Sequence, residues 1–427
     1  MTETARQNDP RDPHAPHPAT PPHAAPTPAT PPHAAPTPAA PQPAPDVAAP
    51  HAAPVTAPDA AAPLPAPTPR NARLEALRLV AILSIAVFHT FQPWFAAATD
   101  GRVDLGVPVL AALGLVSLLG AFGNHVFFML SGYFLLPSAA RRSREPGYWR
   151  DQLRSTAARS AKLLACVAVW AVAALLVSTL VVPVPGVSPH EAGWLVGGLE
   201  FVWVYLALVW LAPLLGWLWE RLPHPRAWVC GLVCLALLAN AYVAFVSPGS
   251  EVRGLLEWRK LLSAATYLVS FLLGAAVASW RRGSTSSGAR TLLAAVAACA
   301  VAEAACAETG ATSLMVALSF KSTSALSLAL AVACLVRASA PGRRPSPRAC
   351  GAILWLTPSI LGFYVAQSVF SPLWRPWFEG LCASALAAGG PWALLACGLL
   401  LSAALLAVTL VADRVARVAP LRRLGLA

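Results

Sequence analysis

The feature that most constrains this chain is a series of long apolar runs separated by short polar segments. A run of about 18 or more apolar residues is long enough to cross the hydrocarbon core of a bilayer. Hydrophobic residues make up 57% of the 427-residue chain and charged residues only 12%, whereas a soluble domain carries about 25% charged residues. The sequence therefore predicts an all-α, polytopic membrane bundle. About ten transmembrane helices are expected, at 76–97, 111–136, 160–182, 198–219, 227–247, 262–280, 290–307, 313–336, 351–371 and 391–412.

The positions of the basic residues orient this bundle. With a cytoplasmic N-terminus, most of them fall in cytoplasmic loops and few in outer loops, as the positive-inside rule requires. An even number of spans then places both termini in the cytoplasm, and we expect a multi-pass protein of the cell inner (plasma) membrane, surrounded by lipid. The cytoplasmic set is Arg141, Arg142, Arg144, Arg150, Arg154, Arg221, Arg226, Arg281, Arg282, Arg290, Arg337, Arg343, Arg344, Arg348, Arg414, Arg417, Arg422 and Arg423, and the outer set is Arg102, Arg253, Arg259, Lys260 and Arg375.

The segments outside the apolar runs differ in composition. Residues 1–70 are rich in Pro, Ala and His, and ATPPHAAPTP occurs twice in tandem, which predicts a disordered cytoplasmic tail. Residues 71–415 form the expected membrane domain, and 416–427 a basic cytoplasmic tail. The net charge of +12 is spread between the apolar runs, so it does not indicate a nucleic-acid partner. No metal site is expected, because the tail histidines lack fixed geometry and the nine cysteines lie mostly inside apolar segments.

Glu75, Arg78 and His89 form a polar stripe on the first span. Arg78 and His89 are eleven residues apart, so in a helix they point the same way, roughly 16 Å apart along the axis. Glu75 lies one turn before Arg78 and can pair with it. Such a stripe faces the interior of a bundle or a wet cavity rather than lipid. It is either a membrane anchor with a packing histidine, or a site in which histidine is a general base and arginine binds phosphate or carboxylate.

Several stretches resemble the membrane acyltransferase-3 family, in family order over about residues 73–375. Glu75-Ala-Leu-Arg78 followed by His89 is similar to its opening motif of an acidic residue, Arg and His. GNHVFFMLSGYFLLP (123–137) resembles its Phe-Phe-x-x-Ser-Gly-Tyr/Phe segment, with the basic residues Arg141 and Arg142 after it. Weaker likenesses are FVWVYLALVWLAPLL (201–215), YLVSFLLGAAVASW with Gly274 (267–280) and LGFYVAQSVFSPLW (361–374).

The chain departs from the family pattern at two places. Gln367 stands where many members carry the His of a late Tyr-x-x-His element, of which Tyr364 is the tyrosine. His125, preceded by Asn124, stands where the second motif often has Asp. His125 is therefore either a substrate contact or a hydrogen-bonded interior residue.

The resemblance implies transfer of an acyl group, usually acetyl from acetyl-CoA, to a hydroxyl of a cell-envelope glycan, a lipid-linked sugar or a small molecule. His89 would take the proton of the acceptor hydroxyl, with Arg78 and the Arg141/Arg142 pair near the donor phosphates and Glu75 orienting Arg78. Acetyl-CoA enters as a co-substrate, and no bound cofactor is expected. The remaining expected substrate contacts are Asn124, His125, Ser131, Tyr364 and Gln367. Ser131 is a candidate hydrogen-bond donor, or with Gly132 a site of close helix packing.

Other interpretations stay open from the sequence. His89 could itself accept the acyl group as an acyl-imidazole. A transporter or flippase for a lipid-linked sugar or metabolite would also have ten spans and buried polar groups, although no internal repeat is visible in them. A scaffold that docks partners through the Pro-rich tail would leave the polar stripe without a role. Glu303, Glu308 and Lys321 are expected to form a buried ion pair between the seventh and eighth spans, or to lie in loops.

Overall fold

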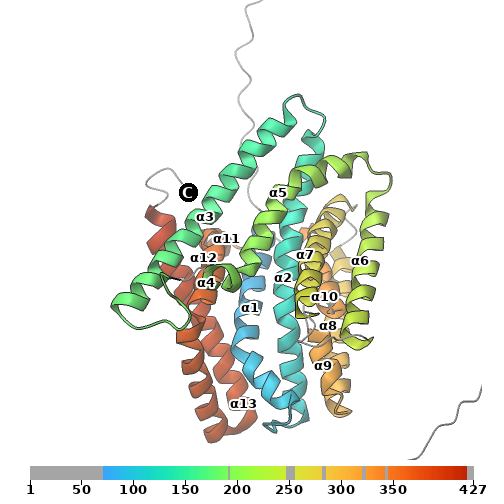
Figure 1. The fold of residues 1–427 in the computed structure, drawn as a ribbon. Helices are drawn as coiled ribbons and strands as arrows, with labels where there is room; N and C mark the ends of the chain where they lie inside the picture. Colours follow the sequence, from blue (N-terminus) through green and yellow to red (C-terminus); the bar gives the residue numbers. More distant parts are fainter. Residues whose placement is uncertain are drawn as a thin grey trace, which may run out of the picture. The chain divides into compact units, whose positions relative to one another are not determined.

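The computed structural model describes residues 71–190, 193–246, 255–280, 285–319, 324–341 and 345–420. These residues are helices and short connections without a strand, which confirms the predicted all-α class (Figure 1). The helices are α1 (Ala72–Thr99), α2 (Val107–Arg142), α3 (Tyr148–Leu180), α4 (Gly193–Gly198), α5 (Glu200–Arg221), α6 (Pro225–Ala241), α7 (Leu255–Ser279), α8 (Thr285–Glu308), α9 (Thr312–Ser319), α10 (Ala325–Ser339), α11 (Pro347–Leu356), α12 (Ile360–Val369) and α13 (Ser371–Asp413).

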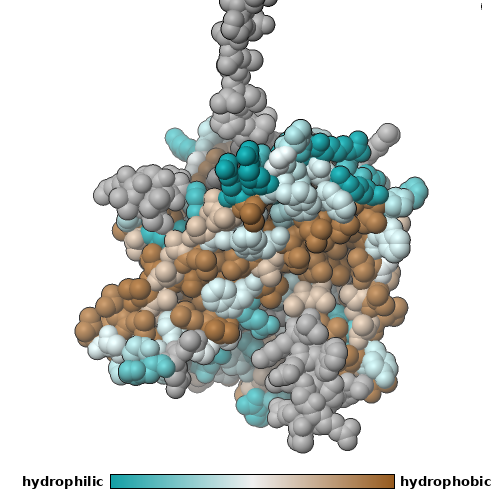
Figure 2. Space-filling view, turned by 45° about the horizontal axis from the view of Figure 1, so that its top comes forward, coloured by the Kyte–Doolittle hydropathy of each residue, from teal (hydrophilic) through white to brown (hydrophobic). Residues whose placement is uncertain are grey.

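The helices have the length and surface of a multi-pass membrane protein. Among the described residues, eight helical segments are long and apolar enough to cross a bilayer, and α6 and α10 are shorter apolar helices that match two further expected spans. Large apolar side chains such as Leu235, Leu400 and Val408 are more than 60% exposed, which suits contact with lipid rather than water. On the face drawn in Figure 2, hydrophobic residues form a broad band with hydrophilic residues gathered above it.

Helix α2 is the centre of the packing, since it contacts α1, α5, α7, α8 and α10 (Figure 1). Glycines allow two of these contacts to be close. A Cβ at Gly120 would lie 2.5 Å from the Phe88 ring of α1. A Cβ at Gly132 would overlap the backbone carbonyl oxygen of Phe271 in α7, and one at Gly274 would overlap that of Met129. Small residues at such crossings are the usual means of close helix packing in membranes.

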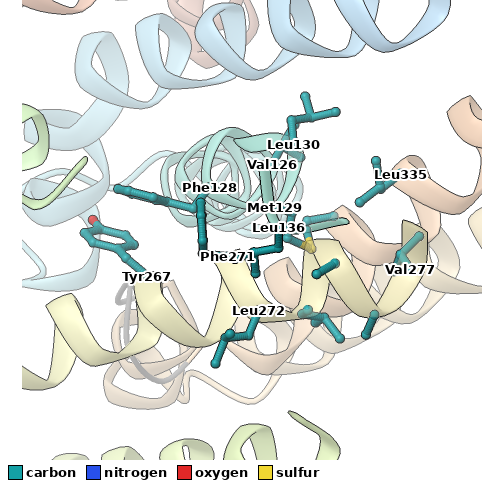
Figure 3. Close-up of a cluster of buried hydrophobic side chains, with 14 of the residues drawn as sticks. Val126, Phe128, Met129, Leu130, Leu136, Tyr267, Phe271, Leu272, Val277 and Leu335 are labelled. Carbon is teal, nitrogen blue, oxygen red and sulfur yellow. The ribbon is translucent and has the colours of Figure 1, made fainter. Parts of the chain in front are cut away.

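The α2–α7 contact is filled by large side chains around these glycines. Phe128 of α2 lies stacked against Tyr267 of α7, with ring centroids 4.4 Å apart, and Met129 and Phe271 are fully buried beside them (Figure 3). Burial of each such side chain contributes about 1.5–3 kcal/mol relative to exposure in water, although the gain over lipid is smaller. The second and sixth expected spans, α2 and α7, are therefore held together by complementary packing of their side chains and glycines.

Two arginines satisfy the carbonyl groups at the ends of neighbouring helices. Arg73 at the start of α1 donates hydrogen bonds to the carbonyl oxygens of Ala340 and Arg337, which close α10, the latter at 2.6 Å. Arg226 at the start of α6 donates to the hydroxyl of Ser279 (3.0 Å) and to its carbonyl oxygen at the end of α7. Carbonyl groups at a helix C-terminus lack partners within the helix and carry partial negative charge, so a cation there is favourable.

A buried ion pair joins α13 to α3 and α12. Asp413 accepts hydrogen bonds from Arg417 Nε at 2.8 Å, from Arg417 Nη2 at 2.7 Å and from Trp170 Nε1 of α3 at 2.9 Å. Arg417 also donates to the carbonyl oxygen of Pro358, just before α12, at 2.9 Å. A Cβ at Gly362 of α12 would overlap the Asp413 carboxylate, so the absence of a side chain there is what admits the pair.

Several expected boundaries are wrong. The single span expected at 313–336 is divided into α9 and α10, with 320–323 outside the described residues. Residues 371–389, expected as an outer loop, form the first part of α13, which turns sharply at Gly390 (φ 75°) into the expected span 391–412. Arg141 and Arg142 lie in the last turn of α2, and Arg150 and Arg154 lie in α3, rather than in a loop.

The two tails give a mixed outcome. Arg417, which lies in the expected basic cytoplasmic tail 416–427, is buried in the ion pair with Asp413. The N-terminal tail 1–70 and residues 421–427 lie outside the described residues.

Candidate functional site

The stripe of α1 begins with an ion pair. Arg78 Nη1 lies 2.9 Å from both carboxylate oxygens of Glu75, one helical turn earlier. The Glu75 side chain is 6% exposed and that of Arg78 is 27% exposed. Arg78 also lies over the Phe134 ring of α2, 5.1 Å from its centroid. Glu75 and Phe134 thus hold the guanidinium from two sides, while its partial exposure leaves N–H groups that can bind an anion.

His89 lies three turns further along α1, roughly 16 Å from Arg78 along the axis. Its ring is half-buried and meets the Phe88 ring edge-on, with centroids 5.1 Å apart. Phe88 in turn packs on Gly120, so α2 passes close to α1 at this depth. The arrangement places a titratable ring inside the bundle, as expected for a stripe that avoids lipid.

Helix α12 brings the late element of the sequence to the same part of α1. Tyr364 packs in one buried cluster with Ile82, Ile85 and Ala86 of α1, and Ile85 lies one turn before His89. Tyr364 is 6% exposed, stacks on Phe201 of α5 at 4.6 Å, and its hydroxyl has no hydrogen-bond partner among the described residues. The structure therefore packs Tyr364 of the ninth expected span against the part of α1 that lies one turn before His89.

Gln367 lies on the same short helix as Tyr364, three residues later, and is 5% exposed. Its backbone carbonyl oxygen accepts a hydrogen bond from Trp374 Nε1 at 3.3 Å. An amide can donate and accept hydrogen bonds but cannot serve as a general base near neutral pH. Gln367 is thus suited to contact a substrate rather than to exchange a proton with it.

The expected contacts on α2 divide between two faces of the helix. His125 is 1% exposed, and its Nδ1 lies 2.8 Å from Ser270 Oγ of α7, so its ring is directed toward α7. Ser131 donates its hydroxyl to the carbonyl oxygen of Phe127 in its own helix at 2.9 Å. These contacts favour the interior-residue interpretation of His125 and the packing interpretation of Ser131 and Gly132. Asn124 is half-buried and lies seven residues before Ser131, on the same face of α2.

Basic residues gather where α2 and α5 end and α3 begins. Arg141 is exposed and Arg142 half-buried in the last turn of α2. Nearby, Arg144 pairs with Glu220 at 2.8 Å, and Arg221 contacts Ser143 Oγ at 3.4 Å. Within the described ranges neither Arg141 nor Arg142 forms an ion pair; Arg141 is exposed, whereas the Nε atom of Arg142 is buried.

Sequence reasoning missed three groups near these residues. Tyr267, Ser270 and Phe201 lie in stretches whose sequence shows only an apolar or aromatic character. The ring contacts of Phe201 and Tyr267 and the hydrogen bond of Ser270 depend on the fold. Glu303, by contrast, was noticed. It is fully buried against Gly114 and Met315, and its two oxygens have no hydrogen-bond partner within the part of the chain that is described. Glu308 is exposed at the end of α8, and Lys321 is outside the described residues.

Metal ligands do not gather in this region: over the described residues, no three side chains of His, Cys, Asp or Glu come together. The comparisons with known proteins give one match. The sequence model of a family described as an acyltransferase domain matches residues 71–412, which is more than half of the chain and includes every α-helix that carries a candidate residue. Searches of curated proteins and of solved structures found no match.

Proposed function

Because this chain belongs to the acyltransferase-3 family of membrane acyltransferases, we propose that it transfers an acetyl group from acetyl-CoA to a hydroxyl of a cell-envelope glycan, a lipid-linked sugar or a small molecule. One observation carries the proposal. A single helix presents a partly exposed arginine, Arg78, which is held by Glu75, and three turns further along a half-buried histidine, His89, one turn from the cluster that contains Tyr364. A donor that is polyanionic at one end and reactive at the other matches such a helix.

The proposed reaction needs one proton transfer. His89 takes the proton of the acceptor hydroxyl as its oxygen bonds to the carbonyl carbon of the thioester. The carbon–sulfur bond then breaks, and the proton passes from His89 to the departing thiolate. The products are the acyl ester and free CoA, and His89 returns to its starting state. Histidine suits both steps because its ordinary pKa is near neutrality.

The donor is proposed to bind at the basic end of the bundle. Arg78 is oriented by Glu75, and Arg141 and Arg142 add two positive charges at the end of α2. Phosphate groups bind guanidinium groups through paired, charge-assisted hydrogen bonds. With this end in the cytoplasm and the protein in the inner membrane, both termini are cytoplasmic and the acceptor reaches His89 from deeper in the bundle or from the outer side.

Reconstituted vesicles test the proposal directly. The purified protein is supplied with acetyl-CoA labelled in the acetyl group and with an extract of envelope glycans and lipids, and products are examined by mass spectrometry for the gain of one acetyl group. His89→Ala is expected to abolish transfer, whereas His190→Ala, which changes an exposed loop histidine, keeps it. Normal transfer by His89→Ala overturns the assignment of His89.

The same vesicles separate the alternatives. Movement of a glycan across the bilayer without consumption of acetyl-CoA would establish a transporter instead. An acetyl group found on His89 after acid quenching, in the absence of acceptor, would replace the proton-transfer route by an acyl-imidazole route.

A further inference from the structure

Six aromatic rings from four helices form a continuous cluster beside the stripe of α1. The ring cluster consists of Phe127 and Phe128 of α2, Phe201 and Tyr205 of α5, Tyr267 of α7 and Tyr364 of α12. Phe201 is at its centre, with ring centroids 4.6 Å from Tyr364, 4.9 Å from both Phe127 and Phe128, and 6.2 Å from Tyr267. The cluster touches α1 through Tyr364, which packs with Ile85 one turn before His89.

The base and the rim of the ring cluster differ in exposure. Phe128, Tyr267 and Tyr364 are 0%, 2% and 6% exposed and form its base. Phe127, Phe201 and Tyr205 are half-buried and form its rim. The cluster therefore runs from partly exposed rings to buried tyrosines.

Both buried tyrosines carry a hydroxyl without a hydrogen-bond partner in the described part of the chain. Each is more than nine-tenths buried, and both rings pack on Phe201, with centroid distances of 6.2 Å for Tyr267 and 4.6 Å for Tyr364. A buried hydroxyl that is left unpaired is unfavourable and uncommon in folded proteins. The two tyrosine hydroxyls of the ring cluster can therefore donate hydrogen bonds to a ligand group that has one carbonyl acceptor and is otherwise apolar.

A thioester carbonyl with a short alkyl group is such a group. We propose that the ring cluster is the acyl subsite, in which Tyr267 and Tyr364 donate hydrogen bonds to the carbonyl oxygen of the donor and the Phe201 ring, which packs on both tyrosines, limits the room for the alkyl group, so that only short acyl groups are accepted. This inference rests on the proposed function. As the acceptor oxygen bonds to the carbonyl carbon, negative charge moves to the carbonyl oxygen, where the two phenol hydrogens stabilise it. The charge returns as the carbon–sulfur bond breaks and His89 hands its proton to the thiolate.

The two halves of the inference have separate tests. Tyr267→Phe and Tyr364→Phe remove only a hydroxyl and keep the stacked ring. Because neither hydroxyl has a hydrogen-bond partner among the residues that the structure describes, a merely structural role predicts unchanged or slightly higher thermal stability and unchanged transfer. The subsite instead predicts a fall in kcat/KM for acetyl-CoA of 10-fold or more in each variant, because a donor to the developing oxyanion is lost. Tyr242→Phe, which changes a tyrosine that is 58% exposed, serves as the matched control.

Phe201→Ala tests the chain-length limit. Purified variants in vesicles are given acetyl-CoA and hexanoyl-CoA, and the ratio of the two rates is measured. We expect Phe201→Ala to raise the ratio of the hexanoyl rate to the acetyl rate at least 10-fold. Removal of the ring makes room for several methylene groups, and each methylene group that a binding pocket accepts or excludes changes the relative rate about 10-fold or more. Phe95→Ala removes an equally large ring from a different buried cluster of α1 and should leave the ratio unchanged.

The outcomes are distinguishable from those of the proposed function. Acetyl transfer by the unaltered protein, combined with an unchanged ratio in Phe201→Ala or normal kcat/KM in both tyrosine variants, overturns the subsite and leaves the proposed function standing. Absence of transfer from any acyl-CoA by the unaltered protein overturns both. Transfer with the expected changes in the tyrosine variants and in Phe201→Ala supports both.

Discussion

Replacing Asp413 by alanine should be among the most destabilising single changes in this protein. The carboxylate accepts three hydrogen bonds, two from Arg417 and one from Trp170. The side chains of Asp413 and Arg417 are 0% and 9% exposed, so Asp413→Ala leaves a buried guanidinium without its counter-charge. Breaking a buried ion pair in this way costs about 3–5 kcal/mol of unfolding free energy.

Three further variants separate the contributions to this loss of unfolding free energy and provide a control. Trp170→Phe removes one hydrogen bond to the charged carboxylate, worth about 1.5–3 kcal/mol. Asp100→Ala breaks the exposed pair with Arg102, whose side chains are 60% and 64% exposed, and should cost no more than about 1 kcal/mol. Combining Asp413→Leu with Arg417→Met removes both charges and should recover most of the stability, because an apolar pair avoids the desolvation cost.

The unfolding free energies can be measured in mixed micelles by titrating with sodium dodecyl sulfate and following helix content by circular dichroism. The pair also anchors the start of α12, because Arg417 binds the Pro358 carbonyl oxygen, so folded Asp413→Ala should also transfer acetyl groups more slowly. A loss of less than 1 kcal/mol in Asp413→Ala, or a double variant as unstable as the single one, would refute this reasoning.

Further changes probe the site and its support. Gly132→Ala introduces a Cβ that overlaps the Phe271 carbonyl oxygen, and the forced separation of α2 and α7 should lower stability by about 1–3 kcal/mol in the same titration. Glu75→Gln removes the charge that orients Arg78 and should raise KM for acetyl-CoA several-fold with a smaller effect on kcat; an unchanged KM would separate Arg78 from donor binding. Ser270→Ala removes the hydrogen-bond partner of His125 Nδ1 and should reduce thermal stability without changing transfer per folded molecule. A large loss of kcat would instead indicate that His125 takes part in the reaction.

Most spans could be predicted because a bilayer imposes one strong requirement on each. A helix must be apolar over about 20 residues, and that pattern is visible without knowledge of its neighbours. The boundaries that failed depend on neighbours. Residues 371–389 resemble a connection because of Pro372, Pro376 and the charged Arg375 and Glu379, yet they form a helix that a turn at Gly390 joins to residues 391–413.

The stripe of α1 could also be predicted, because its ion pair and the common direction of its side chains both depend only on spacing within one helix. The Glu75–Arg78 pair follows from a spacing of three residues, and the common direction of Arg78 and His89 follows from helical periodicity. The Asp413–Arg417 pair has the same kind of spacing. The pair is buried because it contacts Trp170, more than two hundred residues away in the sequence, and Gly362, more than fifty residues away. No local sequence pattern indicates these contacts.

The two histidines show why a motif alone does not assign chemistry. His89 and His125 each lie inside an apolar span, and the sequence offers each as a substrate contact. In the fold, His125 is 1% exposed and its Nδ1 is held by Ser270 on the α7 side of α2. His89 is half-buried and lies one turn from the cluster that contains Tyr364. A general base must reach its substrate and exchange its proton in each cycle, and access is a property of the neighbouring helices. The same argument applies to the tyrosines. Tyr267 belongs to no expected site, yet its buried hydroxyl makes it as good a candidate as Tyr364 to donate a hydrogen bond to the acyl group.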